Sequence, residues 1–312
     1  MSIDVSYCIV NTEQRPLLER CLNAIAREQE TLDIATEVLV LDNASRDGSV
    51  GMARSHPVTT ELIRREQRRG KAENDSTLMQ RARGRYCLLL NEDSELLPGA
   101  TRALFDALEA DPGAATAGAK LLRPDGTQYP SAWRFPTPRT AFYAAVGLHK
   151  RLTVQSRGNK VREVDWAQSA ALLVRREAAA RIGWMDPAFF VYSDEVDFCK
   201  RLHDAGWRNL YVPQAEAIHH EQLSTGSVPT RRIVELSRNR ERYMRKHHSL
   251  PAVLAVRWLT AWTYTVRAIV AYALPRHDPA RYWQHVRATL HPERGEGLRE
   301  AAADYNRGGP RL

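Results

Sequence analysis

The strongest constraint on the fold is an alternation of short apolar segments with helix-like segments over about the first 120 residues. Val5–Val10, Glu37–Leu41 and Tyr86–Leu90 are apolar runs of the length and composition that form buried strands. Between them, Pro16–Glu30 and Lys71–Arg83 have the pattern of helices. This strand–helix–strand order predicts an α/β fold with a mostly parallel central sheet and helices on both faces.

Further segments extend this prediction toward residue 220. Residues 123–160 contain several prolines and glycines, which predict a loop-rich insertion. From about Arg231 the pattern is helical and basic to the end. The remaining expected elements are strands at Leu62–Ile63, Val164–Arg175, Leu210–Pro213 and Ala217–Ile218, and helices at Pro98–Ala110, Glu177–Ile182 and Val196–Ala205.

The charge of the chain is unevenly distributed. Residues 1–220 contain 29 basic and 29 acidic side chains, whereas residues 221–312 contain 16 basic and 8 acidic ones. The formal charge of +8 therefore comes from the last third of the chain. A nucleic-acid-binding protein normally spreads or stripes its positive charge over its main fold, so this distribution argues against that class. It predicts a neutral catalytic or binding body with a basic appendage.

The basic appendage has two interpretations. Arginines and lysines are dense between Arg231 and Lys246, and Leu250–Pro275 follows with large apolar side chains at helical spacing. A helix rich in tryptophan and flanked by cations is typical of a membrane-interface helix. A helix that packs on the catalytic domain with its arginines in solvent explains the same pattern. The apolar positions are Leu254, Trp258, Leu259, Trp262, Val266 and Ile269.

The remaining composition favours a cytoplasmic protein that is peripheral, if attached at all, to the cytoplasmic face of the membrane. Met1–Asp4 lacks the features of a secretory signal, and no stretch reaches about 18 uncharged apolar residues. The four cysteines, Cys8, Cys21, Cys87 and Cys199, are widely separated, so we expect buried thiols rather than disulfides or a metal site.

Three polar clusters follow predicted strands or precede a predicted helix. Ligands of open α/β sheets bind beyond the carboxyl ends of the strands, which places Asn11, Asp42 and Asn91–Asp93 on one rim. Carboxylates there can hold Mg²⁺ or Mn²⁺. Asp194–Asp197 contains three carboxylates within four positions, more than helix capping needs, and close like charges suit a general base. His219–His220 is a candidate metal-ligand pair.

Two glycine-rich phosphate-binding patterns are missing from the sequence. No GxGxxG follows the first predicted strand, and no GxxxxGK[ST] occurs. Their absence argues against a dinucleotide-dependent dehydrogenase and against a P-loop kinase.

Taken in order, the motifs resemble those of the family 2 inverting glycosyltransferases with the GT-A fold, within the rhamnosyltransferase-like branch. The resemblance covers about residues 3–225 and implies a GT-A catalytic domain at 1–225 with a basic, amphipathic helical extension at 226–312. The motifs are Val5–Asn11, Val40–Ser49, Ala82–Tyr86, Leu89–Ser94, Leu97–Ala100, Leu121–Gly126, Asp165–Trp166, Leu172–Arg176, Asp194–Asp197, Ala205–Trp207, Tyr211–Pro213 and His219–His220.

The resemblance also implies roles for individual residues. The nucleotide would be bound on one side by residues at the ends of the first two strands, and on its other side by the Gly70–Lys71 loop. Asn91, Glu92 and Asp93 occupy the family's DxD position, where Asp93 would hold Mn²⁺ or Mg²⁺ together with His219, or alternatively His220. Asp194 and Glu195 occupy the position of the acceptor-activating acids. The implied nucleotide contacts are Asn11, Thr12, Glu13, Asp42, Asn43, Gly70 and Lys71.

Three features depart from the family pattern. Asn91 replaces the first acid of the DxD motif. The acidic pair is Asp194–Glu195 where the family ordinarily has Glu-Asp, so either residue can be the base. Ala170 stands where the family tends to have glycine.

The resemblance implies a metal-dependent inverting transfer of a sugar from a nucleotide-diphosphate donor to an acceptor hydroxyl. The acceptor would be a glycan or a lipid-linked sugar in cell-envelope or extracellular polysaccharide or glycolipid assembly, with no nucleic acid involved and a possible membrane contact through 231–275. Two alternatives stay open: a nucleotidyltransferase, and an inactive family member that acts as a membrane-surface scaffold.

Overall fold

A computed structural model describes residues 2–220, 229–274 and 277–308. The chain forms two compact units, and each is described by itself. The first unit comprises Met1–Trp133, Gln155–Ala188 and Asp194–Ser224, and the second comprises Arg134–Val154, Phe189–Ser193 and Thr225–Leu312. The boundary expected between residues 225 and 226 lies outside the described residues. Two segments from within the expected catalytic range, 134–154 and 189–193, belong to the second unit.

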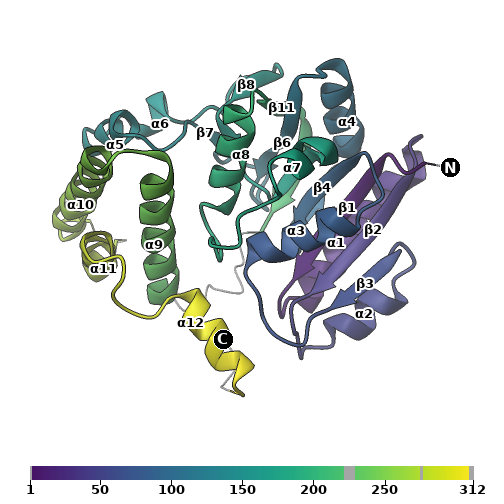
Figure 1. Cartoon of the computed structure of the whole chain (residues 1–312), viewed down its shortest axis with the longest axis horizontal. Helices are drawn as coiled ribbons and strands as arrows, with labels where there is room; N and C mark the ends of the chain where they lie inside the picture. The colour runs from purple at the N-terminus through teal and green to yellow at the C-terminus, as the bar shows by residue number, and fades with distance from the viewer. Residues whose placement is uncertain (1, 221–228, 275–276, 309–312) are drawn as a thin grey trace. The chain divides into compact units, whose positions relative to one another are not determined.

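The first unit is built on one large sheet (Figure 1). Its strands are β1 (Val5–Asn11), β2 (Thr36–Asp42), β3 (Glu61–Arg64), β4 (Tyr86–Asn91), β5 (Ser94–Leu96), β6 (Ala114–Leu122), β8 (Arg162–Val164), β10 (Ala171–Arg175) and β11 (Arg208–His219). The strand order is β3-β2-β1-β4-β10-β6-β11-β5, with β8 paired to β11. A separate two-stranded sheet pairs β7 (Ala132–Trp133) with β9 (Trp166–Ala167).

Strands β3, β2, β1 and β4 are parallel to one another, as are β6 and β11. Strand β10 runs antiparallel between β4 and β6. The predicted α/β fold with a central, mostly parallel sheet is therefore confirmed. Strand β6 was not predicted, because it is rich in alanine and Thr116 is its one β-branched residue, whereas several such residues favour a strand.

Helices cover both faces of this sheet, as expected (Figure 1). Successive side chains of a strand point to opposite faces, so Tyr7 and Ile9 belong to one apolar core and Cys8 to the other. The first core includes side chains of α1 (Arg15–Thr31), α2 (Ser49–Ser55) and α4 (Ala100–Ala110). The second includes side chains of α3 (Lys71–Arg81), α7 (Arg176–Arg181) and α8 (Asp194–Asp204). All four cysteines are buried free thiols, as predicted.

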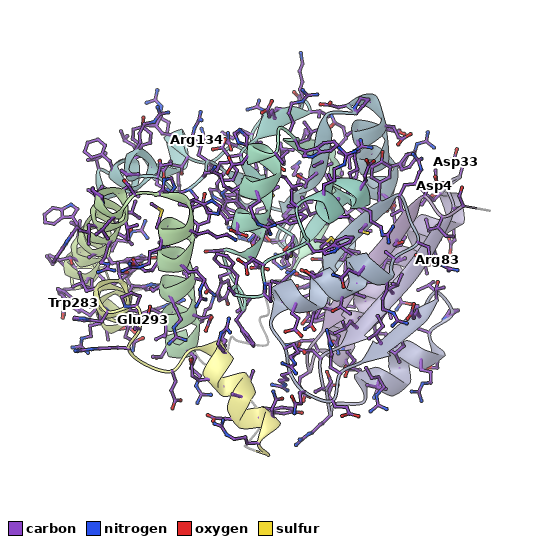
Figure 2. The ribbon with its side chains drawn as sticks, viewed as in Figure 1. Asp4, Asp33, Arg83, Arg134, Trp283 and Glu293 are labelled. Atoms are coloured by element: carbon purple, nitrogen blue, oxygen red, sulfur yellow. The ribbon has the colours of Figure 1, made fainter. Side chains whose placement is uncertain are left out.

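The amino-terminal ends of the strands form a polar edge of their own. Asp4, Asp33 and Arg83, which precede β1, β2 and β4, are labelled on the same side of the first unit in Figure 2. Arg83 binds the buried carboxylate of Glu37 at 2.7 Å, and that carboxylate also accepts a hydrogen bond of 2.6 Å from Ser6. Burial acts to raise the pKa of Glu37, but these hydrogen bonds hold it below its usual value. These contacts are structural, and the candidate site lies at the opposite end of the strands.

The second unit is helical (Figure 1). Its helices are α5 (Pro138–Ala145), α6 (His149–Leu152), α9 (Pro229–His247), α10 (Leu250–Ala271), α11 (Pro279–Leu290) and α12 (Leu298–Asn306). Helix α9 packs against α10, α11 and α12, and α10 also packs against α5 and α11. Helices α5 and α6 lie in the segment that was expected to be a loop. Thr137 begins α5 through a reciprocal capping box with Thr140.

Some basic side chains of α9 form ion pairs inside the second unit. Arg238 binds Glu300 at 2.8 Å, and Arg245 binds Glu241 at 2.8 Å. Glu241 also binds Arg257 of α10. Arg238 thus connects α9 to α12, the Arg245 pair lies within α9, and Arg257 of α10 connects to α9 through Glu241. In the described ranges, no helix is both long enough and apolar enough to cross a bilayer.

A buried carboxylate caps α4, and its removal should destabilise the first unit. Glu28 of α1 is 3% exposed and accepts hydrogen bonds from the backbone amides of Gly99 at 2.6 Å and Thr101 at 2.7 Å. Glu28→Ala leaves these amides unsatisfied and should lower the free energy of unfolding by about 1–3 kcal/mol. Denaturant titration would measure the loss. Glu30→Ala, an exposed position on the same helix, should change it by less than about 0.5 kcal/mol. Equal effects of the two variants would contradict the capping role.

Candidate active site

The candidate site is built on the last residues of neighbouring strands. Asn11 ends β1, Asp42 ends β2 and the two are register partners. The side-chain amide of Asn11 donates to Asp42 Oδ2 at 3.0 Å and to the hydroxyl of Ser45 at 3.2 Å. The backbone amide of Ser45 donates to Asp42 Oδ1 at 2.9 Å. Both expected residues are buried on this rim, and the amide oxygen of Asn11 has no hydrogen-bond partner among the described groups.

Asn43 connects this rim to the turn before α3. Its side-chain amide donates to Thr12 Oγ1 at 3.2 Å and to the carbonyl of Arg69 at 3.1 Å, and its side-chain oxygen accepts from the amide of Arg69 at 2.8 Å. Gly70 follows directly as the residue that caps α3. The structure thus places Thr12, Asn43 and Gly70 close to one another.

Glu13 lies in the same region and is held in place. Its φ angle of 57° is in the left-handed region, which is uncommon for a residue other than glycine. Its carboxylate binds Arg68 at 2.9 Å, and its backbone amide donates to Ser45 at 2.9 Å. The sequence analysis missed Arg68 and assigned no role to Ser45. Both are polar groups in turns, a signal too common to single them out.

Asp93 and His219 meet at the edge of the sheet. Strand β5 pairs antiparallel with the end of β11, so the segment after β4 lies beside His219. His219 Nε2 is 3.1 Å from Asp93 Oδ1 and 3.3 Å from the side-chain amide of Asn91. Asp93 and His219 are each 5% exposed. Burial first, and the nearby Asp93 second, raise the pKa of Glu92 to about 8.

Tyr129 fixes the other side of the His219 ring and was missed by the sequence analysis. Its hydroxyl shares a hydrogen bond with His219 Nδ1, and the two rings stack with centroids 5.9 Å apart. When Nδ1 carries the proton and donates it to the tyrosine oxygen, Nε2 keeps its lone pair on the side of Asp93. Tyr129 lies in the expected loop-rich insertion, where nothing marks it as a partner of a residue 90 positions away.

His220 has a different environment. Its side chain lies 2.7 Å from a carboxylate oxygen of Glu95, and its backbone amide donates to the carbonyl of Asp93 at 3.0 Å. Of the two candidate histidines, His219 is therefore the one whose side chain faces Asp93. Across the part of the chain that the structure describes, no cluster of three or more His, Cys, Asp or Glu side chains could hold a metal ion.

A second acidic group surrounds Lys71. This lysine begins α3 and binds Asp75 one turn further along at 2.5 Å. Burial acts to lower its pKa, but the charges of Asp75, Asp194 and Glu195 raise it above the usual value. Lys71 also lowers the proton affinity of Glu92. Its ammonium group thus acts on both acidic groups, the one after β4 and the one at the start of α8.

Asp194 and Glu195 occupy the first turn of α8. Burial first, and the charge of Asp194 second, raise the pKa of Glu195 well above its usual value. Asp194 is 1% exposed, and neither of its carboxylate oxygens accepts a hydrogen bond from a donor among the described residues. Asp197 differs, because it binds Arg201 at 2.8 Å. Of the three carboxylates, Asp194 and Glu195 therefore remain candidates for the site, whereas Asp197 is part of an ion pair within α8.

The chain resembles the solved structures of two glycosyltransferases, which place its fold in the GT-A class. One is the mannosyltransferase PcManGT from Pyrobaculum calidifontis in complex with GDP-Man and Mn²⁺ (TM-score 0.57, 17% identity, 97% of this chain and 86% of that one). The other is GalNAc-T7 with UDP, GalNAc and Mn²⁺ (TM-score 0.59, 13% identity, 99% of this chain and 58% of that one).

The sequence comparison gives the family. Glycosyl transferase family 2 matches residues 6–169, which is more than half of the chain, and the chain belongs to that family. It is 31% identical over 191 residues to the N-acetylglucosaminyl-diphospho-decaprenol L-rhamnosyltransferase of Mycobacterium tuberculosis, covering 59% of this chain and 62% of that protein. It is 40% identical over 57 residues to the rhamnosyltransferase WbbL of Escherichia coli, covering 18% of this chain and 22% of that protein. The resemblance to the rhamnosyltransferase-like branch is confirmed.

Removing the Lys71 ammonium should destabilise the folded chain. Lys71→Met leaves the buried carboxylate of Asp75, which is 1% exposed, without its cation. The expected loss is about 3–5 kcal/mol at neutral pH, the usual effect of breaking a buried pair. Lys200→Met is a matched control. Its partner four residues on is Asp204, whose side chain is 49% exposed, so the expected loss is about 0.3–0.5 kcal/mol.

The pH dependence of the Lys71→Met effect distinguishes a lost charge from lost packing. Burial already raises the pKa of Asp75, and removal of Lys71 raises it further. An acid whose pKa is higher in the folded state than in the unfolded state destabilises the protein above its unfolded pKa, about 3.9 for aspartate. The deficit should therefore shrink as the pH is lowered toward about 4, where this carboxyl takes up a proton in both states. A deficit independent of pH would contradict the electrostatic explanation.

Proposed function

We propose that this chain transfers a sugar from a nucleotide-diphosphate donor to an acceptor hydroxyl with inversion at the anomeric carbon. The observation that carries the proposal is the pair Asp194–Glu195 at the start of α8, which lies near the same Lys71 ammonium that acts on Glu92. Asp194 is buried, and its carboxylate accepts no hydrogen bond from the described residues. Family membership supplies the reaction class. The polar network of Asn11, Asp42 and Asn43 supplies a rigid edge for the nucleotide.

The donor and acceptor follow from the relatives. The mycobacterial relative is named for L-rhamnose transfer to a diphospho-decaprenol-linked sugar, and WbbL is also named a rhamnosyltransferase. We therefore propose an L-rhamnosyl donor and a lipid-linked acceptor, with a role in cell-envelope or extracellular polysaccharide assembly. Because the chain spans 62% of the length of the mycobacterial relative, the remainder of that protein has no counterpart in the match.

The residues Asp93 and His219 fit a divalent cation. Their Oδ1 and Nε2 atoms lie 3.1 Å apart, close to the ~3 Å expected for adjacent ligands with bonds of about 2.1 Å. Tyr129 holds the imidazole from the opposite nitrogen, as outer partners of metal-bound histidines do. The donor diphosphate would complete the coordination, and a bound Mn²⁺ or Mg²⁺ would offset the negative charge that the leaving group gains.

The acidic pair would accept the proton of the acceptor hydroxyl. The hydroxyl oxygen forms a bond to the anomeric carbon as the bond from that carbon to the diphosphate breaks, and the hydroxyl proton passes to a carboxylate. A carboxylate with a raised pKa binds that proton more tightly than an exposed one. The charge of Lys71 nearby keeps one member of the pair ionised. We assign the base to Glu195 and its electrostatic support to Asp194.

Substitution of Glu195 tests the base. Glu195→Gln should bind the nucleotide-sugar donor with little change and lower kcat by about 10²–10⁴-fold, the usual worth of a general base. The acidic limb of the wild-type rate profile should lie above the pH expected for an exposed glutamate, because a raised pKa keeps the base protonated to higher pH. Glu177→Gln, at an exposed glutamate, is the control.

Product analysis separates this activity from the alternatives. Release of nucleoside diphosphate identifies a transferase, release of pyrophosphate a nucleotidyltransferase, and neither product an inactive scaffold. A Glu195→Gln enzyme with the wild-type rate and pH profile would overturn the assignment of the base to Glu195.

Substitution of Tyr129 tests the support of His219 by a direct binding measurement. Tyr129→Phe removes the hydroxyl at His219 Nδ1 and should weaken Mn²⁺ binding by about 10–100-fold, as loss of an outer ligand partner does. Electron paramagnetic resonance of free Mn²⁺, in the presence of nucleoside diphosphate, measures the affinity. Tyr272→Phe, at a residue 72% exposed, should leave it unchanged. Equal Mn²⁺ affinity of the Tyr129 variant and the wild-type protein would remove Tyr129 from the site.

A further inference from the structure

Helix α10 packs with its small side chains and leaves its large apolar side chains in solvent. Val253, Val256, Ala261, Ala268 and Ala271 are buried. The exposed stripe recurs at intervals of three or four residues, so its members lie on one side of the helix. Those members, which we call the outer stripe, are Leu254, Trp258, Trp262, Val266 and Ile269.

The degree of exposure is unusual for these residue types. Trp258 is 63% exposed, Trp262 is 58% and Ile269 is 60%. Single exposed apolar residues are ordinary, but a contiguous apolar stripe marks a surface that binds something. No lysine, arginine, aspartate or glutamate belongs to the outer stripe. Within the second unit, the large apolar side of α10 therefore points away from the unit's own helices.

The helices beside α10 add to this apolar surface. Helix α5 packs against α10, and α6 packs against α5 (Figure 1). Phe142, within α5, is 52% exposed, and Val146, just after its end, is 50% exposed. Leu148 and Leu152, at the two ends of α6, are 42% and 36% exposed. These residues lie in the segment 123–160, where the sequence predicts a loop-rich insertion and no membrane contact.

The net positive charge of the chain comes from the second unit. Its three segments contain 20 Lys and Arg against 7 Asp and Glu, a formal charge of +13. The first unit contains the other 25 basic and 30 acidic residues, a formal charge of −5. Lys150 and Arg151 of α6 are exposed beside the apolar residues of that helix. Burial first, and then the charges of Arg267 and Lys150, lower the pKa of His149. Cations from α6 and α10 therefore lie near the same histidine.

We propose that the second unit docks on an anionic lipid bilayer through the outer stripe of α10 and the exposed apolar residues of α5 and α6. Tryptophan is favoured at the interface between hydrocarbon and water, and nearby cations are attracted to anionic headgroups. A second copy of the chain is a poorer occupant, since two units of charge +13 repel each other while a bilayer of opposite charge attracts. This inference does not depend on the transfer reaction.

Vesicle binding tests the proposal with the full chain. The protein should sediment with vesicles of phosphatidylglycerol and phosphatidylcholine, and less with pure phosphatidylcholine or at 0.5 M salt, which is on the order of three times physiological ionic strength. Trp258→Ser with Trp262→Ser should weaken binding by at least about tenfold per tryptophan. Lys150→Glu with Arg151→Glu should weaken binding to anionic vesicles alone. Val161→Ser, at a 45% exposed apolar residue of the first unit, is the matched control.

A second variant pair keeps the result independent of folding. Trp258→Phe with Trp262→Phe preserves the apolar stripe, so it should bind vesicles like the wild-type protein while losing most of the fluorescence quenching by brominated lipids. Vesicle binding unaffected by the serine variant, or no binding by the wild-type protein, would overturn the proposal. The proposal would also be overturned if light scattering showed the wild-type protein as a dimer and the serine variant as a monomer, because the outer stripe would then bind a second copy. Without vesicles, all variants should release nucleoside diphosphate at the wild-type rate. If the wild-type protein itself released none, that result would overturn the proposed function and not the membrane proposal.

Discussion

The register of the parallel strands is the constraint on which the rest of the structure depends. Because Asn11 pairs with Asp42 and Val10 with Asn91, three strands end together and deliver polar side chains to one rim. A shift of one residue in any strand would turn these side chains to the other face and bring apolar ones to the edge. The buried alternation of Tyr7, Cys8 and Ile9 between two cores resists such a shift. Apolar packing therefore determines the geometry of the polar site.

The parts that the sequence predicted are those with a strong local signal. The apolar runs of β1, β2 and β4 identified the sheet, and the polar residues that end them identified the rim. Strand β6 and Tyr129 gave no such signal. The first is rich in alanine and is a strand through its pairing with β10 and β11. The second meets His219 because it is hydrogen-bonded to β6, and β11 returns beside β6. Long-range pairing of this kind has no counterpart in a residue's sequence neighbours.

The acidic residues illustrate the same difference between composition and placement. Asp194, Glu195 and Asp197 look alike in sequence, yet Arg201 binds Asp197 and leaves the first two near Lys71. The basic run of α9 also looks uniform in sequence, yet Glu300 and Glu241 bind part of it. A charge count predicts how much charge a segment carries. Only the fold decides which charges are compensated within the chain.

The division of charge between the two units has a consequence for orientation. Near an anionic surface, a unit of +13 is attracted and a unit of −5 is repelled, so the chain experiences a torque before any apolar side chain touches lipid. The torque acts over roughly one Debye length, about 8 Å at physiological salt. A chain arriving in any orientation would be turned within that distance to present its helical unit first. Alignment at the surface would then be a property of the whole sequence, independent of the residues that perform chemistry.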